Sequence, residues 1–188
     1  KAVSQNHSKS NFYLGFAYLH SNEKEKAEIH MRKGATESGN SNLLVRFGLE
    51  KLGGERLSQS NEVAYEMFKK ADFMGNLNGT LNLAKCYSKG IGCQINLDLA
   101  SQLFDNGISR SIPEFYEPAS DCFRQLKGFS NWKKSKKLAS SAKKVQERIY
   151  VKNEEKINEN NKIEDNNEYN PYGNLIKARQ AKLIDLKN

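Results

Sequence analysis

The residues of this chain best suited to ligate a metal or to act as nucleophiles are its histidines and cysteines. They are His7, His20, His30, Cys86, Cys93 and Cys122. No histidine lies two to five residues from another histidine or a cysteine, the spacing that zinc sites commonly use. No signature places a base beside a serine or cysteine, as nucleophilic catalysis requires. The sequence therefore predicts no metal site, no cofactor and no enzymatic activity.

The clearest pattern lies in the spacing of apolar and small residues, which recurs at an offset of 36 residues. Ala64 and Phe68 recur as Ala100 and Phe104. A fixed period of this size is typical of stacked helix pairs, none of which can bury its apolar face alone. Such stacks bind other macromolecules more often than they catalyse. Further matches are Phe47, Gly48 and Gly54 with Leu83, Ala84 and Gly90, and Tyr87 and Gly92 with Phe123 and Gly128.

Helical periodicity predicts two helices in each repeat, and glycines mark several of their ends. Gly39 and Gly75 follow the second helix of a pair, where a residue past the helix end often has a positive φ. Gly15 and Gly48 lie within first helices, where a small residue would let two helices approach closely. The expected helices span about residues 10–20 and 23–36, 42–52 and 62–74, and 77–89 and 97–109, and a fourth pair begins near Pro113.

The three cysteines are expected to be packed thiols. Cys86 and Cys122 occupy equivalent places in successive repeats, so they should lie about 10 Å apart. That distance is too long for a disulfide bond. Cys86 and Cys93 could pair only if the loop between them folds back, and the sequence leaves this alternative open.

Three motifs give the chain a family resemblance. Residues 10–18 (SNFYLGFAY), 83–92 (LAKCYSKGIG) and 64–75 (AYEMFKKADFMG) resemble the first helix, the Gly-x-Gly loop and the second helix of Sel1-like repeats (SLR), a variant of the tetratricopeptide solenoid. The resemblance covers about residues 1–128 and is most specific in the third repeat. Three departures are Lys51 in place of an aromatic residue, a first loop three residues short, and Pro118 inside the fourth repeat's first helix.

The resemblance implies an all-α fold, a right-handed superhelical solenoid of antiparallel helix pairs. It also implies that first helices line the concave face and that this face binds a partner protein. Aromatic and arginine side chains there would be the natural anchors. By resemblance, the partner-binding residues would be Phe12, Tyr13, Phe16, Arg46, Leu49, Asn82 and Lys85.

The net charge of +8 is concentrated late in the chain, since residues 1–128 carry +2 and residues 129–188 carry +6. An apolar stripe through Leu138, Ala142, Val145 and Ile149 predicts a helix over about residues 129–152 that caps the stack. Such a basic helix is expected to face an acidic protein partner or solvent. Contact with nucleic-acid phosphates is an alternative function. The lysines that would do so are Lys133, Lys134, Lys136, Lys137, Lys143 and Lys144.

The expected organisation has four parts. Residues 1–128 hold the repeats, with a partial repeat in 1–9, then 10–40, 41–76, 77–112, and 113–128 onward. Residues 129–152 form the basic capping helix, 153–170 a polar Asn/Glu-rich linker, and 171–188 a short amphipathic helix that docks on the stack or serves as a partner motif. Residues 1–8 match the end of a second helix and its exit turn, so we expect a piece of a longer solenoid.

The function expected from these features is that of a protein-binding scaffold or adaptor. The resemblance implies a bacterial setting, in which such a protein neutralises a toxin or serves secretion or host contact. A second alternative is kinship with Cys-rich relatives linked to penicillin-type ligands, but their paired cysteines are missing here. No apolar run approaches the roughly 18 residues needed to span a bilayer. We therefore expect a soluble segment, with periplasm and cytoplasm both open.

Overall fold

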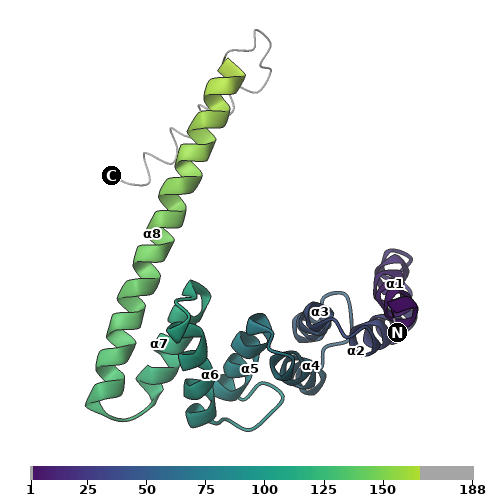
Figure 1. The fold of residues 1–188 in the computed structure, drawn as a ribbon, viewed down its shortest axis with the longest axis horizontal. Coiled ribbons are helices and arrows are strands. Elements are labelled where there is room, and N and C mark those ends of the chain that lie inside the picture. Colours follow the sequence, from purple (N-terminus) through teal and green to yellow (C-terminus); the bar gives the residue numbers. More distant parts are fainter. Residues whose placement is uncertain (1, 166–188) are drawn as a thin grey trace. The chain divides into compact units, whose positions relative to one another are not determined.

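The computed structural model describes residues 2–165, and within that range the chain forms helices and no strands (Figure 1). It divides into two compact units, Lys1–Ala142 and Lys143–Asn188, so the last helix contributes to both. The helices are α1 (Ala2–His20), α2 (Lys24–Glu37), α3 (Ser41–Gly53), α4 (Asn61–Phe73), α5 (Leu77–Lys89), α6 (Leu97–Ser109), the 3₁₀ turn η1 (Pro113–Phe115), α7 (Tyr116–Gln125) and α8 (Phe129–Asp165). No helix in the described range combines a bilayer-spanning length with an apolar composition.

The first unit is a series of helix pairs in chain order, as the repeat period predicts. The pairs are α1 with α2, α3 with α4, and α5 with α6. Each pair packs on the next, α2 on α3 and α4 on α5, and α6 packs on α7. Contacts between neighbouring repeats are the hallmark of a solenoid.

Side chains that cap the helices recur at the 36-residue period. Asn40 and Asn76 accept hydrogen bonds at the starts of α3 and α5 from the amides of residues 42 and 78, both at 3.0 Å. Ser60 and Asn96 do the same for α4 and α6. Such caps satisfy backbone N–H groups that have no partner inside the helix. The 36-residue period is therefore present in the capping residues at the helix starts as well as in the apolar core.

Backbone turns between repeats follow the same period. Gly39 and Gly75 have φ values of 63° and 76°, and Ser111 takes the same left-handed conformation at 57°. This confirms the expected role of the two glycines, because left-handed backbone costs glycine little. Ser111 shows that the third turn keeps this geometry without a glycine.

Two buried clusters form the core of the first unit. The first extends from Phe12 on α1 to Cys86 on α5, and the second from Leu81 on α5 to Leu138 on α8. Tyr87 and Leu103 pack against both clusters and so join them. The core is therefore a seam running along the helix pairs.

Small residues inside first helices allow the close packing that the sequence predicts. A Cβ atom on Gly15 would lie 2.2 Å from Met31 Cγ, and one on Gly48 would lie 2.6 Å from Phe68 Cε1. Either distance is a clash with the second helix of the same pair. The expected role of these two glycines is confirmed.

The start of α1 differs from the prediction. Residues 2–10 continue the same helix as residues 11–20, so the turn expected within residues 1–8 is wrong. Asn6 occupies the place of the closing glycine Gly75 in that register. Without glycine or proline there, the helix propagates. The idea of a preceding partial repeat over residues 1–9 therefore loses the turn that supported it.

The polar linker expected from residue 153 is also wrong up to Asp165, because α8 continues through Asp165. Its composition offers little to bury, but the backbone N–H and C=O groups inside the helix are paired with each other and no breaker interrupts them. No glycine or proline lies between Gly128 and Pro171. Residues 166–170 of the expected linker and the amphipathic helix over 171–188 lie outside the described residues.

Pro118 leaves its helix unbroken. The fourth repeat begins with the 3₁₀ turn Pro113–Phe115, and α7 starts only at Tyr116. Pro118 thus falls in the first turn of α7, where its missing N–H has no acceptor within the helix anyway. The later start of α7 removes the distortion that Pro118 would cause deeper in a helix.

Candidate partner-binding surface

Six of the seven residues predicted to bind a partner occupy equivalent positions on successive first helices. One row is Tyr13, Arg46 and Asn82, and the other is Phe16, Leu49 and Lys85, each with steps of 33 and 36 residues along α1, α3 and α5. Equivalent positions of stacked repeats share one side of the stack. We call these six residues the first-helix face.

Phe12 does not belong to this face. Its side chain is 0% exposed. A Cβ atom added to Gly34 would lie only 2.3 Å from the Phe12 backbone nitrogen. Glycine at that position of α2 lets α1 approach closely. Phe12 therefore packs in the core, and its predicted place on an accessible surface is wrong.

Phe16 and Arg46 lie together as part of one cluster. The Arg46 guanidinium carbon is 4.2 Å from the centre of the Phe16 ring, a cation–π distance. Arg56, from the segment after α3, also approaches the ring, at 5.5 Å. Arg56 is held by Glu50, with its Nε 3.0 Å from Glu50 Oε2. Arg56 is the member of this cluster that the sequence analysis missed, since its position in a loop carries no repeat signal.

The remaining members of the face differ in exposure and charge. Tyr13 is 54% exposed and Leu49 46% exposed, so two large apolar side chains of this face are open to solvent. Asn82 is half-buried and donates to the Asn78 carbonyl at 2.8 Å. Lys85 is also half-buried. Burial lowers its pKa, the positive charge of Lys89 lowers it further, and Glu117 partly opposes both.

The lysines of the basic helix do not act as one free group. Lys134 is 2.5 Å from Asp105 Oδ1 on α6, and its ammonium sits 4.0 Å above the Phe123 ring of α7. Lys136 lies over the Trp132 ring at 5.1 Å. Lys134 therefore connects the start of α8 to α6 and α7. The other four, Lys133, Lys137, Lys143 and Lys144, are exposed, the last two in the second unit.

The three thiols are unpaired, so the alternative disulfide between Cys86 and Cys93 is not formed. Burial raises the pKa of Cys86 to about 12 and that of Cys122 to about 11. Burial also raises the pKa of Cys93. The thiolate is the nucleophilic form. These cysteines are therefore poor nucleophiles near neutral pH.

A buried polar cluster occupies the place where the sequence departs from the family's aromatic residue. Lys51 is 2% exposed, and its Nζ donates to Glu28 Oε2 at 2.9 Å and to Ser58 Oγ at 3.0 Å. The equivalent place in the next repeat holds Tyr87, whose hydroxyl lies 3.1 Å from that of Tyr65. The Lys51–Glu28 pair thus replaces a tyrosine pair.

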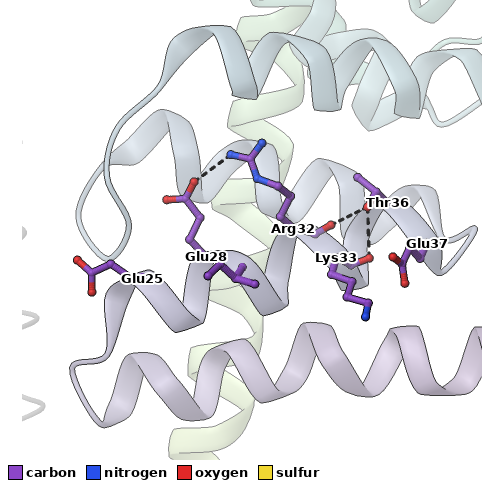
Figure 2. A pocket seen from close by; sticks show the side chains of 7 residues that line it. Glu25, Glu28, Arg32, Lys33, Thr36 and Glu37 are labelled. Atoms are coloured by element: carbon purple, nitrogen blue, oxygen red, sulfur yellow. Dashed lines mark hydrogen bonds and ion pairs between the residues drawn. The ribbon is translucent and has the colours of Figure 1, made fainter.

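The structure also has a hollow of about 430 Å³ along α2 (Figure 2). Every residue that lines it comes from this one helix, so no second element converges on it. Arg32 and Glu28 are bound to each other across it at 3.0 Å, and Thr36 donates to the Arg32 carbonyl at 2.9 Å. The hollow is therefore an open furrow beside a helix. Its lining residues are Glu25, Glu28, Ile29, Arg32, Lys33, Thr36 and Glu37.

The described residues bring no three histidine, cysteine or carboxylate side chains together in a cluster that could hold a metal ion. His30 has other partners. Its Nδ1 lies 3.2 Å from Asn11 Oδ1, and its ring stacks on Tyr18 with centroids 5.1 Å apart.

Comparison with known proteins identifies the fold. The structure is similar to that of a Sel1 repeat protein from Oxalobacter formigenes, with a TM-score of 0.54 and 22% identity over 73% of this chain and 57% of that protein. It is also similar to a protective antigen of uropathogenic Escherichia coli that displays an SLR fold, with a TM-score of 0.54 and 18% identity over 74% of this chain and 32% of that protein.

The chain therefore has the Sel1-like repeat fold, as its motifs predict. It spans 57% and 32% of the length of these two proteins. No protein-family model and no curated protein matches the sequence.

Proposed function

We propose that this chain is a protein-interaction scaffold that holds a partner protein on the first-helix face. The observation that carries the proposal is the stacking of Arg46 on Phe16, on a face that also carries two exposed apolar side chains, Tyr13 and Leu49. Aromatic and arginine residues dominate the binding energy of many protein interfaces. Solenoids of this kind offer extended surfaces for such binding.

Within this role we propose a bacterial setting, in which the partner is a toxin to be neutralised or a component of secretion or host contact. The two similar structures come from bacteria, and one of them is described as a protective antigen. A scaffold that covers a partner's surface is suited to each of these tasks. Genes next to the one that encodes this chain would name the partner class.

Affinity capture with surface variants tests the proposal. The full chain should recover one stoichiometric partner from its native host. The double variant Tyr13→Ala with Arg46→Glu should lose that partner, because it removes an apolar anchor and reverses the central charge. Lys33→Glu on α2 is the matched control, since it reverses an exposed charge away from the face and should retain the partner. Retention by the double variant would place the partner elsewhere.

Nucleic-acid binding by the basic helix is a weaker second proposal. It rests on the exposed lysines of α8, which are Lys133 and Lys137 in the first unit and Lys143 and Lys144 in the second. Phosphate contacts make affinity fall steeply as salt rises. Binding of duplex DNA or RNA that weakens in this way, and that disappears when the four lysines are changed to glutamine, would favour it over the scaffold.

A further inference from the structure

We infer that the first-helix face binds a short partner segment that combines an apolar anchor with carboxylates, and that crosses from α1 over α3 to α5. The inference rests on the proposed function and names the chemistry of the partner. Three features carry it: the apolar end of the face, the orientation of Arg46, and the positive charge at the far end.

The apolar end lies on α1 and α3. Tyr13, Phe16 and Leu49 combine two exposed side chains with one that is half-buried. Large apolar side chains left exposed on one face of a protein can mark an interaction site. An aromatic or aliphatic side chain of the partner would cover them.

Arg46 lies at the centre of the face, at the position between Tyr13 and Asn82 in its row. The stacking of its guanidinium on Phe16 restricts the side chain before any partner binds. A guanidinium stacked in this way still presents N–H donors at its edge, and these match a carboxylate in a two-point contact. Within the described residues, Arg46 has no carboxylate at ion-pair distance.

The far end of the face, on α5, is positively charged. Lys85 and the exposed Lys89 act on each other, and both lack an ion-pair partner within the described range. The carboxylate of Glu50 on α3 is paired with Arg56. The carboxylate that affects the pKa of Lys85 is that of Glu117, which raises it. Residues 1–128 carry only +2. The positive charge here is therefore local, and partner carboxylates would offset it.

The span of the face suits a short segment. α3 packs on α5, and Arg46 of α3 reaches the Phe16 ring of α1. Two steps of about 10 Å then put α1 and α5 roughly 20 Å apart. An extended chain of about six residues covers that distance. The apolar anchor would lie over Tyr13 and Leu49, and the carboxylates over Arg46, Lys85 and Lys89.

A random-peptide display library selected on the full chain tests this inference. We expect the enriched peptides to combine an aromatic or aliphatic residue with nearby acidic residues. A dye-labelled copy of the commonest peptide should bind at least about tenfold more weakly to Arg46→Glu with Lys85→Glu. The control Lys33→Glu with Lys69→Glu, which reverses two exposed charges on second helices, should change its affinity by less than about twofold.

A peptide of reversed charge distinguishes loss of the charge contacts from loss of folding in the variant chain. The same peptide with lysine in place of its acidic residues should bind the doubly reversed chain better than the original peptide does, because opposite charges then face each other again. Failure of this rescue would overturn the inference.

The remaining outcomes separate the inference from the proposed function. Neutral or basic peptides whose binding still depends on Tyr13 and Leu49 would overturn the inference and leave the scaffold in place. Enrichment of no peptide that depends on this face would overturn both. Displacement of the acidic peptide by a single-stranded oligonucleotide at equal concentration would also overturn it, because the face would then bind a polyanion without an apolar anchor.

Discussion

At the residue scale, Lys51 shows how one substitution changes the chemistry between repeats. Its ammonium is almost fully buried and has two partners, Glu28 and Ser58. Burial alone would raise the pKa of Glu28, but hydrogen bonds from Lys51, Arg32 and Ser58 outweigh burial and lower it. A buried ion pair adds little net stability, yet loss of one partner leaves the other charge uncompensated.

We predict that Lys51→Met lowers the free energy of unfolding by about 2 kcal/mol, less than for a fully buried pair because Glu28 keeps some contact with water. The double variant Lys51→Tyr with Glu28→Tyr should lose less, since it copies the Tyr65–Tyr87 pair of the next repeat. Urea unfolding measures both. A neutral Lys51→Met, or a double variant less stable than Lys51→Met, would contradict this account.

The buried thiols predict a loss of stability at alkaline pH. The pKa of Cys86 rises from its ordinary value of 9.0 to about 12 in the folded chain, and that of Cys122 to about 11. The unfolded chain ionises these thiols first, so the free energy of unfolding is intact below pH 9 and falls as the pH rises towards 12. Urea unfolding across this range should show the fall.

The control for this pH effect is Cys86→Ala with Cys122→Ala. Tyr87 also contributes, because its hydrogen bond with Tyr65 and its burial raise its pKa to about 12. The double variant should therefore lose less stability between pH 9 and 12 than the original chain, but still some. Equal losses in the two proteins would show that the thiols do not cause the effect.

At the element scale, the helix caps are a second local signal that agrees with the apolar period. Asn40, Asn76, Ser60 and Asn96 mark helix starts by a local bond that depends only on neighbouring residues. Apolar periodicity and the closing glycines predicted the helices α3 to α6 to within one residue at each end, and the caps coincide with these starts. The prediction failed at the start of α1, expected near residue 10, and in α8, expected to end near residue 152. The repeat period does not extend to either place.

The capping residues differ in the other hydrogen bonds that they make. Asn96 accepts from the Leu99 amide at 3.0 Å. Asn76 caps α5 in the same way, and its amide also donates to Ser41 Oγ at 3.0 Å and to Asn42 Oδ1 at 2.7 Å on α3. Asn76 therefore joins two repeats as well as capping a helix.

We predict that Asn96→Ala lowers the free energy of unfolding by about 1 kcal/mol, the usual cost of a lost cap. Asn76→Ala should cost more, because it also removes the bonds to Ser41 and Asn42. Chemical denaturation compares the two directly. Equal costs would mean that the bonds between repeats add nothing to stability.

At the scale of the whole molecule, local signals could not reveal contacts made across repeats. The period predicted the solenoid, and the family resemblance predicted the binding residues Tyr13, Phe16, Arg46, Leu49, Asn82 and Lys85. The sequence could not show that Phe12 is buried. Phe12 packs closely against α2 only because Gly34 on that helix has no side chain. The Lys51–Glu28 bond and the contact of Arg56 with Phe16 likewise join residues far apart in sequence.

The end of the stack gives the last prediction. A terminal repeat has one neighbour, so it needs a cap to cover its apolar side. We propose that the first part of α8 supplies it, because Leu138 is buried in the second core cluster, Ser120 donates to the Ser135 carbonyl at 3.0 Å, and Lys134 lies over Phe123. All of these contacts lie within the first unit, Lys1–Ala142.

A chain shortened to residues 1–142 should therefore fold and unfold cooperatively, with the helical signal expected for α1 to α7 and the start of α8. A chain shortened to residues 1–128 loses the cap and should melt at a lower temperature, since Phe123 and its neighbours become exposed. Leu138→Ala in the 1–142 chain should fall between them, at a cost of about 2 to 3 kcal/mol. Circular dichroism melting compares the three. Equal melting temperatures for the chains ending at 128 and 142 would show that α8 does not cap the stack.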